Sequence, residues 1–167
     1  MVLPLHPAEE TVIGEATICA SFQQFVKVHE TAVFTFCYRM LGSCRTAESV
    51  AETAFLDTCP RFPAVSLVDV LTAAASRCRE QLPCSGSLRE TAVNDIQHLF
   101  NQLPVPEREV MTLRYSCKLN FTEIAAILNT SGEAVRSALR QGRWHAAKLE
   151  QARLGFCPPG SLATPTG

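Results

Sequence analysis

Apolar residues recur at helical spacing near the start of the chain. Between Ser21 and Leu41 they are Phe22, Phe25, Val26, Val33, Phe36, Cys37 and Met40. This spacing puts them along one side of a helix, which predicts a helix over 21–41 with one buried face. Gly42 follows directly and favours the end of that helix, because glycine is the usual residue just past a helix C-terminus.

Two more helices are predicted in the first half. Thr46 can cap a second helix that has Glu48 in its first turn and ends before Pro60. A third helix fits the stretch from Ser66 to about Leu82, which is rich in alanine. The residues of this third helix that we expect to face inward are Leu67, Val70, Leu71, Ala74 and Ala75.

The second half predicts a four-helix unit. Its first amphipathic stripe consists of Val93, Ile96, Leu99, Phe100 and Leu103. Pro106 then suits the first turn of a new helix, where its missing N–H costs nothing. That helix would bury Val110 and Leu113, and a turn is expected at 118–120.

Residues 120–131 have the pattern of a short helix followed by a tight turn. The inward positions of this helix are Ile124, Ile127 and Leu128. Asn129 can take the left-handed conformation that ends a helix, and Thr130 or Ser131 can cap the next one. Gly132 would open that next helix. Two helices joined in this way, with the second exposed, form the helix-turn-helix arrangement that reads DNA.

The last predicted helix, from Gly132 to Arg153, has distinct core and solvent sides. A helical wheel places on the core side Val135, Leu139, Gly142, Ala146 and Leu149. The basic residues on this helix are Arg136, Arg140, Arg143, Lys148 and Arg153, against two acidic ones, Glu133 and Glu150. This local basic excess predicts contact with phosphates. Trp144 falls opposite the core, where it would contact a protein partner, nucleic acid or the chain's own tail.

No stretch alternates apolar and polar residues as a strand would, so we predict an all-α protein. It would consist of two small helical domains, 21–82 and 89–154, joined by a short linker at 83–88 that contains Pro83 and Gly86. Residues 1–20 are expected to be a loose leader, and residues 155–167 a disordered tail.

Composition narrows the function further. The formal net charge is −1, so any DNA-binding signal has to be local. The eight cysteines contain no C-x-x-C pair and the four histidines are isolated, which favours free, largely buried thiols over a metal site. We predict no cofactor and no enzymatic activity, because no nucleophile–base pair or phosphate loop is present. Without a signal-peptide pattern or a long apolar run, we expect no membrane association and a cytoplasmic setting.

Both halves contain motifs that resemble a bacterial sigma factor of the extracytoplasmic-function (ECF) type, in the sigma-70 family. In the first half these are Tyr38-Arg39-Met40-Leu41-Gly42-Ser43, Ala47-Glu48-Ser49-Val50 and Phe55-Leu56. In the second half they are Leu103-Pro104, Glu107-Arg108-Glu109-Val110, Leu113-Arg114-Tyr115, Glu123-Ile124-Ala125 and Val135-Arg136-Ser137. The two domains would correspond to sigma region 2 and sigma region 4.

The resemblance implies a protein that binds the RNA polymerase core and directs it to promoter DNA, with an anti-sigma factor as a further candidate partner. The polymerase-binding residues that it implies are Arg39, Arg45, Glu48 and Phe55. The helix-turn-helix would read the −35 element and the first domain would help to melt the −10 element. The predicted DNA-binding residues are Arg77, Arg79, Lys118, Thr122, Arg136, Ser137, Arg140, Gln141 and Arg143.

Several positions depart from the family pattern. Ser49 replaces an acidic residue, the third helix lacks the family's tryptophan and asparagine, and Ala134, Ala138 and Gln141 stand where the family has threonine and two arginines. These departures weaken the prediction of promoter melting more than the prediction of −35 binding. A sigma-like adaptor that binds polymerase or another regulator without melting promoters is therefore a second hypothesis. A response regulator is a third, which the lack of strands and of an acidic phospho-acceptor pocket disfavours.

Overall fold

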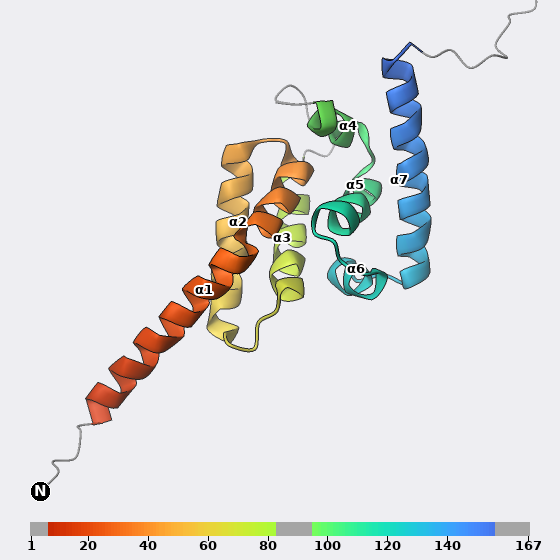
Figure 1. Ribbon diagram of the computed structural model, residues 1–167. Coiled ribbons are helices and arrows are strands. Elements are labelled where there is room, and N and C mark those ends of the chain that lie inside the picture. The colour runs from red at the N-terminus through yellow and green to blue at the C-terminus, as the bar shows by residue number, and fades with distance from the viewer. Residues whose placement is uncertain (1–6, 83–94, 156–167) are drawn as a thin grey trace, which may run out of the picture.

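The structure is a computed structural model that describes residues 7–82 and 95–155, and these are arranged in helices and short connections (Figure 1). Over the described residues no strand occurs, which confirms the all-α prediction. The α-helices are α1 (Pro7–Leu41), α2 (Cys44–Thr58), α3 (Leu67–Gln81), α4 (Asp95–Gln102), α5 (Val105–Met111), α6 (Phe121–Leu128) and α7 (Gly132–Arg153). A 3-10 turn (Cys59–Arg61) follows α2, and a π-helical turn (Thr112–Ser116) continues α5.

The first three helices pack against one another around a shared core. The C-terminal part of α1 supplies Phe36 and Met40, which are fully buried. Val50 of α2 and Leu71 of α3 meet them from the other two helices. The N-terminal part of α1 extends well beyond this bundle (Figure 1). All five of the residues predicted to face inward on α3 are buried or half-buried, as expected.

Two predicted helix starts were wrong. Residues 7–20, expected to belong to a loose leader, are the first turns of α1, which begins at Pro7. Proline is well tolerated at the first helical position, because the N–H it lacks would have no partner there. Helix α2 begins at Cys44 rather than after Thr46, and its cap is Ser43, whose hydroxyl accepts a bond from the Thr46 N–H at 3.4 Å. Glu48 therefore lies beyond the first turn of α2.

The C-terminal half forms a smaller helical unit in which α7 packs on α5 and α6. Its buried apolar residues include Val110, Leu113, Ile124, Ile127, Val135 and Leu139, and all six were predicted to face inward. Ile96 was predicted to be buried in α4, yet its side chain is 57% exposed. The neighbouring Gln97 is fully buried in its place because it bonds to Arg39 of α1.

The two halves lie directly against each other. Helix α3 packs on α6, and α1 contacts α4, α5 and the π-helical turn. The buried apolar residues of both halves form one continuous cluster. The predicted linker at 83–88, the start of the second domain at 89–94 and most of the predicted tail lie outside the described residues.

Candidate DNA-binding helix and partner groove

Local hydrogen bonds fix both ends of the turn between α6 and α7. Asn120 caps α6 by accepting from the Glu123 N–H at 2.9 Å, and Glu123 Oε2 accepts from the Asn120 N–H at 2.8 Å. Asn129 ends α6 in the left-handed conformation with φ 49°, as its sequence position predicted. Ser131 then caps α7 by accepting from the Ala134 N–H at 3.1 Å. These caps hold the two helices in helix-turn-helix order.

Helix α7 lies very close to α5 because it carries a glycine at the crossing. A Cβ added at Gly142 would stand 2.7 Å from the Met111 Sδ and 3.3 Å from the Glu107 Cβ. One residue pair also bridges the two helices, since the His145 Nδ1 lies 2.6 Å from a Glu107 carboxylate oxygen. Helix α7 is thus seated through its core side, which leaves the opposite side to solvent.

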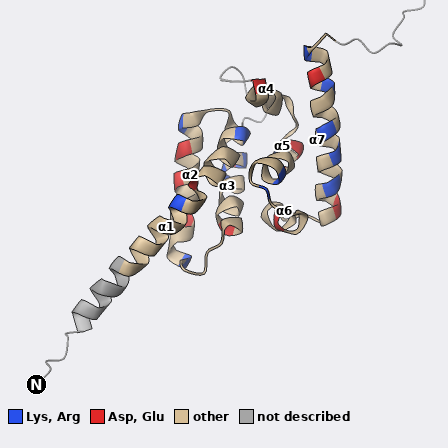
Figure 2. Cartoon of the chain, viewed as in Figure 1, with Lys and Arg blue, Asp and Glu red and all other residues tan. Residues whose placement is uncertain are grey.

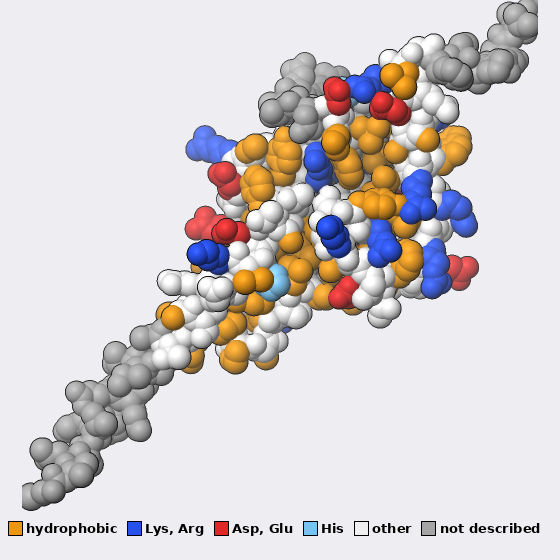
Figure 3. All heavy atoms as spheres, viewed as in Figure 1, with side chains coloured by type: hydrophobic (Ala, Val, Ile, Leu, Met, Phe, Trp, Pro, Cys, Tyr) orange, Lys and Arg blue, Asp and Glu red, His pale blue; other side chains and the backbone are white. Residues whose placement is uncertain are grey.

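Cations gather on the exposed side of α7. Arg136, Arg140, Arg143 and Lys148 are all exposed, and lysine and arginine recur along this helix in Figure 2. In the space-filling view they contribute to a group of basic side chains at the right-hand edge of the molecule (Figure 3). Gln141 is exposed and Ser137 half-buried on the same helix. The structure therefore brings together the five predicted DNA-binding residues of α7.

Aromatic rings hold several of these cations in place. The sequence analysis did not predict these contacts. The Phe121 ring lies under two guanidinium groups, with Arg114 at 5.1 Å and Arg136 at 5.5 Å from its centroid. Tyr115 lies 5.5 Å from the Arg143 guanidinium and its hydroxyl accepts a bond from the Arg143 Nε. Such contacts restrict the arginine side chains before any ligand arrives.

The remaining predicted DNA-binding residues fall into two groups. Lys118, in the turn before α6, and Thr122, in the first turn of α6, are both exposed beside the helix-turn-helix. Arg77 and Arg79 lie on α3, and both are engaged with carboxylates. Arg77 pairs with Asp57 of α2 at 2.7 Å, and Arg79 pairs with Glu109 of α5 at 2.6 Å. These hydrogen-bonded carboxylates raise the pKa of both arginines.

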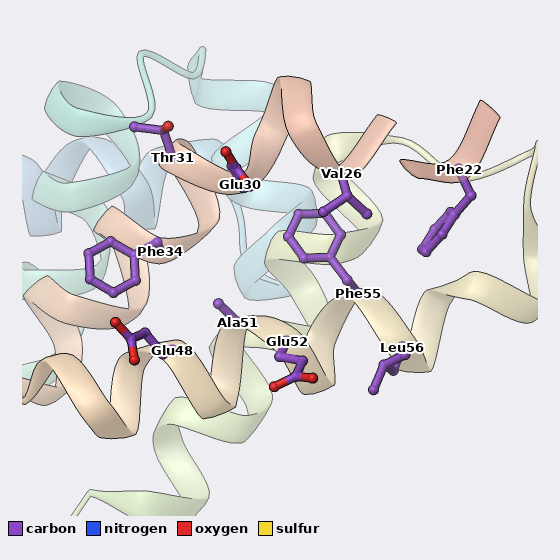
Figure 4. A pocket seen from close by; sticks show the side chains of 10 residues that line it. All are labelled: Phe22, Val26, Glu30, Thr31, Phe34, Glu48, Ala51, Glu52, Phe55 and Leu56. Carbon is purple, nitrogen blue, oxygen red and sulfur yellow. The ribbon is translucent and has the colours of Figure 1, made fainter. Parts of the chain in front are cut away.

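The four predicted polymerase-binding residues do not form one cluster. Glu48 and Phe55 both line a groove of 610 Å³ between α1 and α2 (Figure 4). Arg45 is exposed at the start of α2. Arg39 faces the other half of the protein instead, where its Nη1 donates to the Gln97 Oε1 at 3.0 Å and its guanidinium lies over the Phe100 ring.

The groove combines an apolar lining with carboxylates. Figure 4 shows side chains from both helices around it, including Phe22 and Val26 of α1 and Phe55 and Leu56 of α2. Leu56 is 61% exposed, which is unusual for a leucine in a packed helix pair. Three acidic residues also line the groove, namely Glu30, Glu48 and Glu52. This combination fits an apolar segment that carries positive charge.

The cysteines that the structure describes are all free thiols. Cys37 and Cys78 are buried, whereas Cys19 and Cys44 are exposed. Burial raises the pKa of Cys117 to about 12. Among the described residues no cluster of histidine, cysteine or acidic side chains is suited to hold a metal ion. In the same part of the chain, none of the helices has the length and apolar character needed to cross a membrane.

Comparison with known proteins agrees with this geometry. Residues 94–145, which contain the helix-turn-helix, match the family model for sigma-70 region 4. The C-terminal half therefore belongs to the class of sigma-type helix-turn-helix domains.

The similarity extends to most of the chain. The ECF RNA polymerase sigma factor SigW of Bacillus subtilis (strain 168) is 26% identical, over 74% of this chain and 85% of that relative. Together with the all-α fold and the region 4 match, this similarity supports an ECF-type member of the sigma-70 family.

Proposed function

We propose that the protein is a sigma factor that directs RNA polymerase core to promoters in the bacterial cytoplasm. The observation that carries the proposal is the exposed cationic side of α7 in a capped helix-turn-helix that matches sigma-70 region 4. In this arrangement α7 enters the major groove at a −35-type element. Arg136 and Arg140 contact DNA there, and Arg143, held by Tyr115, adds a further cation.

The groove between α1 and α2 supports a polymerase contact in the first half. An amphipathic helix of the polymerase could place apolar side chains against Phe55 and Leu56 and basic ones near Glu48 and Glu52. Burial of the apolar lining would supply affinity, and the carboxylates would select a basic partner. An anti-sigma factor would have to cover one of these two surfaces to block the activity.

The adaptor hypothesis remains the second candidate because of two observations. Arg79, which is predicted to meet the −10 DNA, is held by Glu109 in the structure, and α3 lacks the family's aromatic residue at the melting surface. A protein that binds polymerase but cannot melt promoters would have both features.

Run-off transcription separates these two functions. Purified core polymerase and the full chain are incubated with DNA from upstream of the protein's own gene, and transcripts are compared with those from core alone. Promoter-dependent transcripts that need the added chain support the sigma factor. Binding to core without transcripts would favour the adaptor.

DNA binding by α7 is tested by replacing Arg136 and Arg140 with alanine together. We expect weaker binding to the promoter duplex and a salt dependence that falls by about one unit of slope per lost phosphate contact. Arg153→Ala is the matched control, because Arg153 lies on the same helix but already pairs with Asp95 and Glu150. Equal affinity and slope in the double variant and in the control would show that α7 does not meet DNA.

A further inference from the structure

Trp144 is a prominent residue of α7 that the proposed function leaves without a role. It is the single tryptophan of the chain. The residue is 59% exposed, on the side of α7 opposite the buried Val135 and Leu139. A large ring left in water on a helix surface stabilises a complex when a ligand covers it. The groups around the ring indicate which kind of ligand that is.

The neighbours of the Trp144 ring on α7 are cationic or neutral. Arg140 lies one helical turn before it and is exposed. Lys148 lies one turn after it, with its ammonium nitrogen 5.2 Å from the ring centroid. The other two positions one turn away are the uncharged Gln141 and Ala147. This surface therefore suits a ligand that offers negative charge together with a small apolar contact.

A protein partner fits this surface less well than a DNA strand does. In the part of the chain that the structure describes, the next large apolar residue exposed along this helix is Leu154, at its C-terminal end. It lies about 15 Å further along the helix axis. The two side chains therefore do not form the continuous apolar centre of a protein interface. A DNA strand needs only one ring-sized contact, because its sugars are separated by phosphates that the cations can meet.

The length of α7 places Trp144 at the edge of the DNA major groove. Arg136 lies about 6 Å along the helix axis from Gly132, whereas Trp144 lies about 18 Å from it. The major groove is about 12 Å wide. When the first turns of α7 face the bases, Trp144 therefore lies past the base edges, beside the strand that bounds the groove.

We propose that Trp144 and Lys148 form a contact site for the sugar–phosphate backbone of one DNA strand. The indole packs against a deoxyribose, and the Lys148 ammonium pairs with the adjoining phosphate. Because neither group touches a base, the site adds affinity without sequence preference. It rests on the proposed function for the placement of α7 on DNA, and it adds a second point of attachment beyond the bases.

The single tryptophan allows this contact to be observed directly. A dye-labelled duplex from upstream of the protein's own gene is titrated into the full chain at low salt, and binding is followed by the anisotropy of the dye. The quenching of Trp144 fluorescence by acrylamide is measured on the same samples. We expect acrylamide quenching to fall as DNA binds and to reach its limit at the DNA concentration where the anisotropy saturates.

Three variants test what each group contributes. Trp144→Ala should weaken binding about three- to tenfold, equally for the promoter duplex and for an unrelated duplex of the same length. Trp144→Phe should retain most of the affinity because a ring remains. Lys148→Ala should lower the salt slope by about one unit, the loss of one phosphate contact. Leu154→Ala is the matched control, since it removes an exposed apolar side chain from the end of α7, and it should bind like the unmodified chain.

Several results would overturn the proposal. Constant acrylamide quenching during DNA binding would show that the ring does not meet the strand and would leave it to a protein partner. A ring already shielded in the free chain would show that another part of the protein covers Trp144. An equal loss of affinity in Leu154→Ala, or a loss confined to the promoter duplex, would exclude a sugar contact. All of these leave DNA binding by α7 intact, whereas an unchanged anisotropy would remove that proposal and this site together.

Discussion

Arg108 is the side chain whose replacement should reveal most about how this fold is held together. It is fully buried, yet among the residues that the structure describes its guanidinium bonds to backbone carbonyls and to no carboxylate. It donates to three backbone carbonyls at helix ends, those of Met40, Asn101 and Leu103, at 2.9–3.0 Å. Burial lowers its pKa below that of free arginine. Because arginine is not deprotonated in proteins, the side chain is a charged group inside the fold.

Two opposing terms set how much an Arg108→Met change lowers the free energy of unfolding. Methionine keeps much of the apolar stem but leaves three buried carbonyls without donors, at a cost of about 1–3 kcal/mol each. The buried guanidinium is itself expensive, and its Nε has no hydrogen-bond partner. Removing it returns several kcal/mol of desolvation energy. We expect a net loss of about 2–4 kcal/mol in the free energy of unfolding, because the orphaned carbonyls outnumber the relieved group.

Thermal and urea unfolding followed by circular dichroism measure this loss. For a chain of this length the melting temperature should fall by about 5–15 °C. Arg45→Met is the matched control, since Arg45 is exposed and its replacement should have little effect. If Arg108→Met has the same melting temperature as Arg45→Met, the bonds to the carbonyls make no net contribution to stability. That result would refute the reasoning from buried donors and acceptors.

Two other predictions concern packing and thiol reactivity. Gly142→Ala and Gly132→Ala both gain helix propensity, but only the first brings a Cβ to 2.7 Å from Met111. In urea unfolding, Gly142→Ala should therefore be less stable than Gly132→Ala by about 1–3 kcal/mol. Equal free energies of unfolding for the two variants would show that α5 and α7 can move apart freely. At pH 8 the raised pKa of Cys117, about 12, keeps its thiolate scarce. Iodoacetamide should therefore label exposed Cys44 well before Cys117 by mass spectrometry, with Cys117 reacting faster as pH rises. Similar labelling rates at pH 8 would contradict the burial of Cys117.

The elements that could be predicted from the sequence are those specified by neighbouring residues. Asn129 and Ser131 define the turn before α7 through the backbone conformation and hydrogen bonds that their own side chains permit. The core side of α7 follows from its apolar spacing. The helical wheel of α7 also placed Trp144 opposite the core, and its side chain is 59% exposed in the structure. Local signals of this kind are present in any short stretch of the chain.

What could not be predicted depends on partners that are distant in sequence. Gln97 is a polar residue beside the apolar Ile96, and only the presence of Arg39 fifty-eight positions away explains why it is the buried one. The family resemblance implies that Arg79 meets nucleic acid, and its pairing with Glu109 depends on how the two halves meet. Neither the hydrophobic period nor a motif contains that information.

Three consecutive residues of α5 connect this short helix to most of the molecule. Glu107 reaches His145 of α7, Arg108 reaches Met40 of α1, and Glu109 reaches Arg79 of α3. Successive side chains on a helix point about 100° apart, so one turn of α5 can serve three directions at once. The seat of α7 and the Arg79–Glu109 contact between the two halves are therefore set by neighbouring side chains of α5. A displacement of α5 that broke the Arg79–Glu109 pair would therefore also move the support of α7.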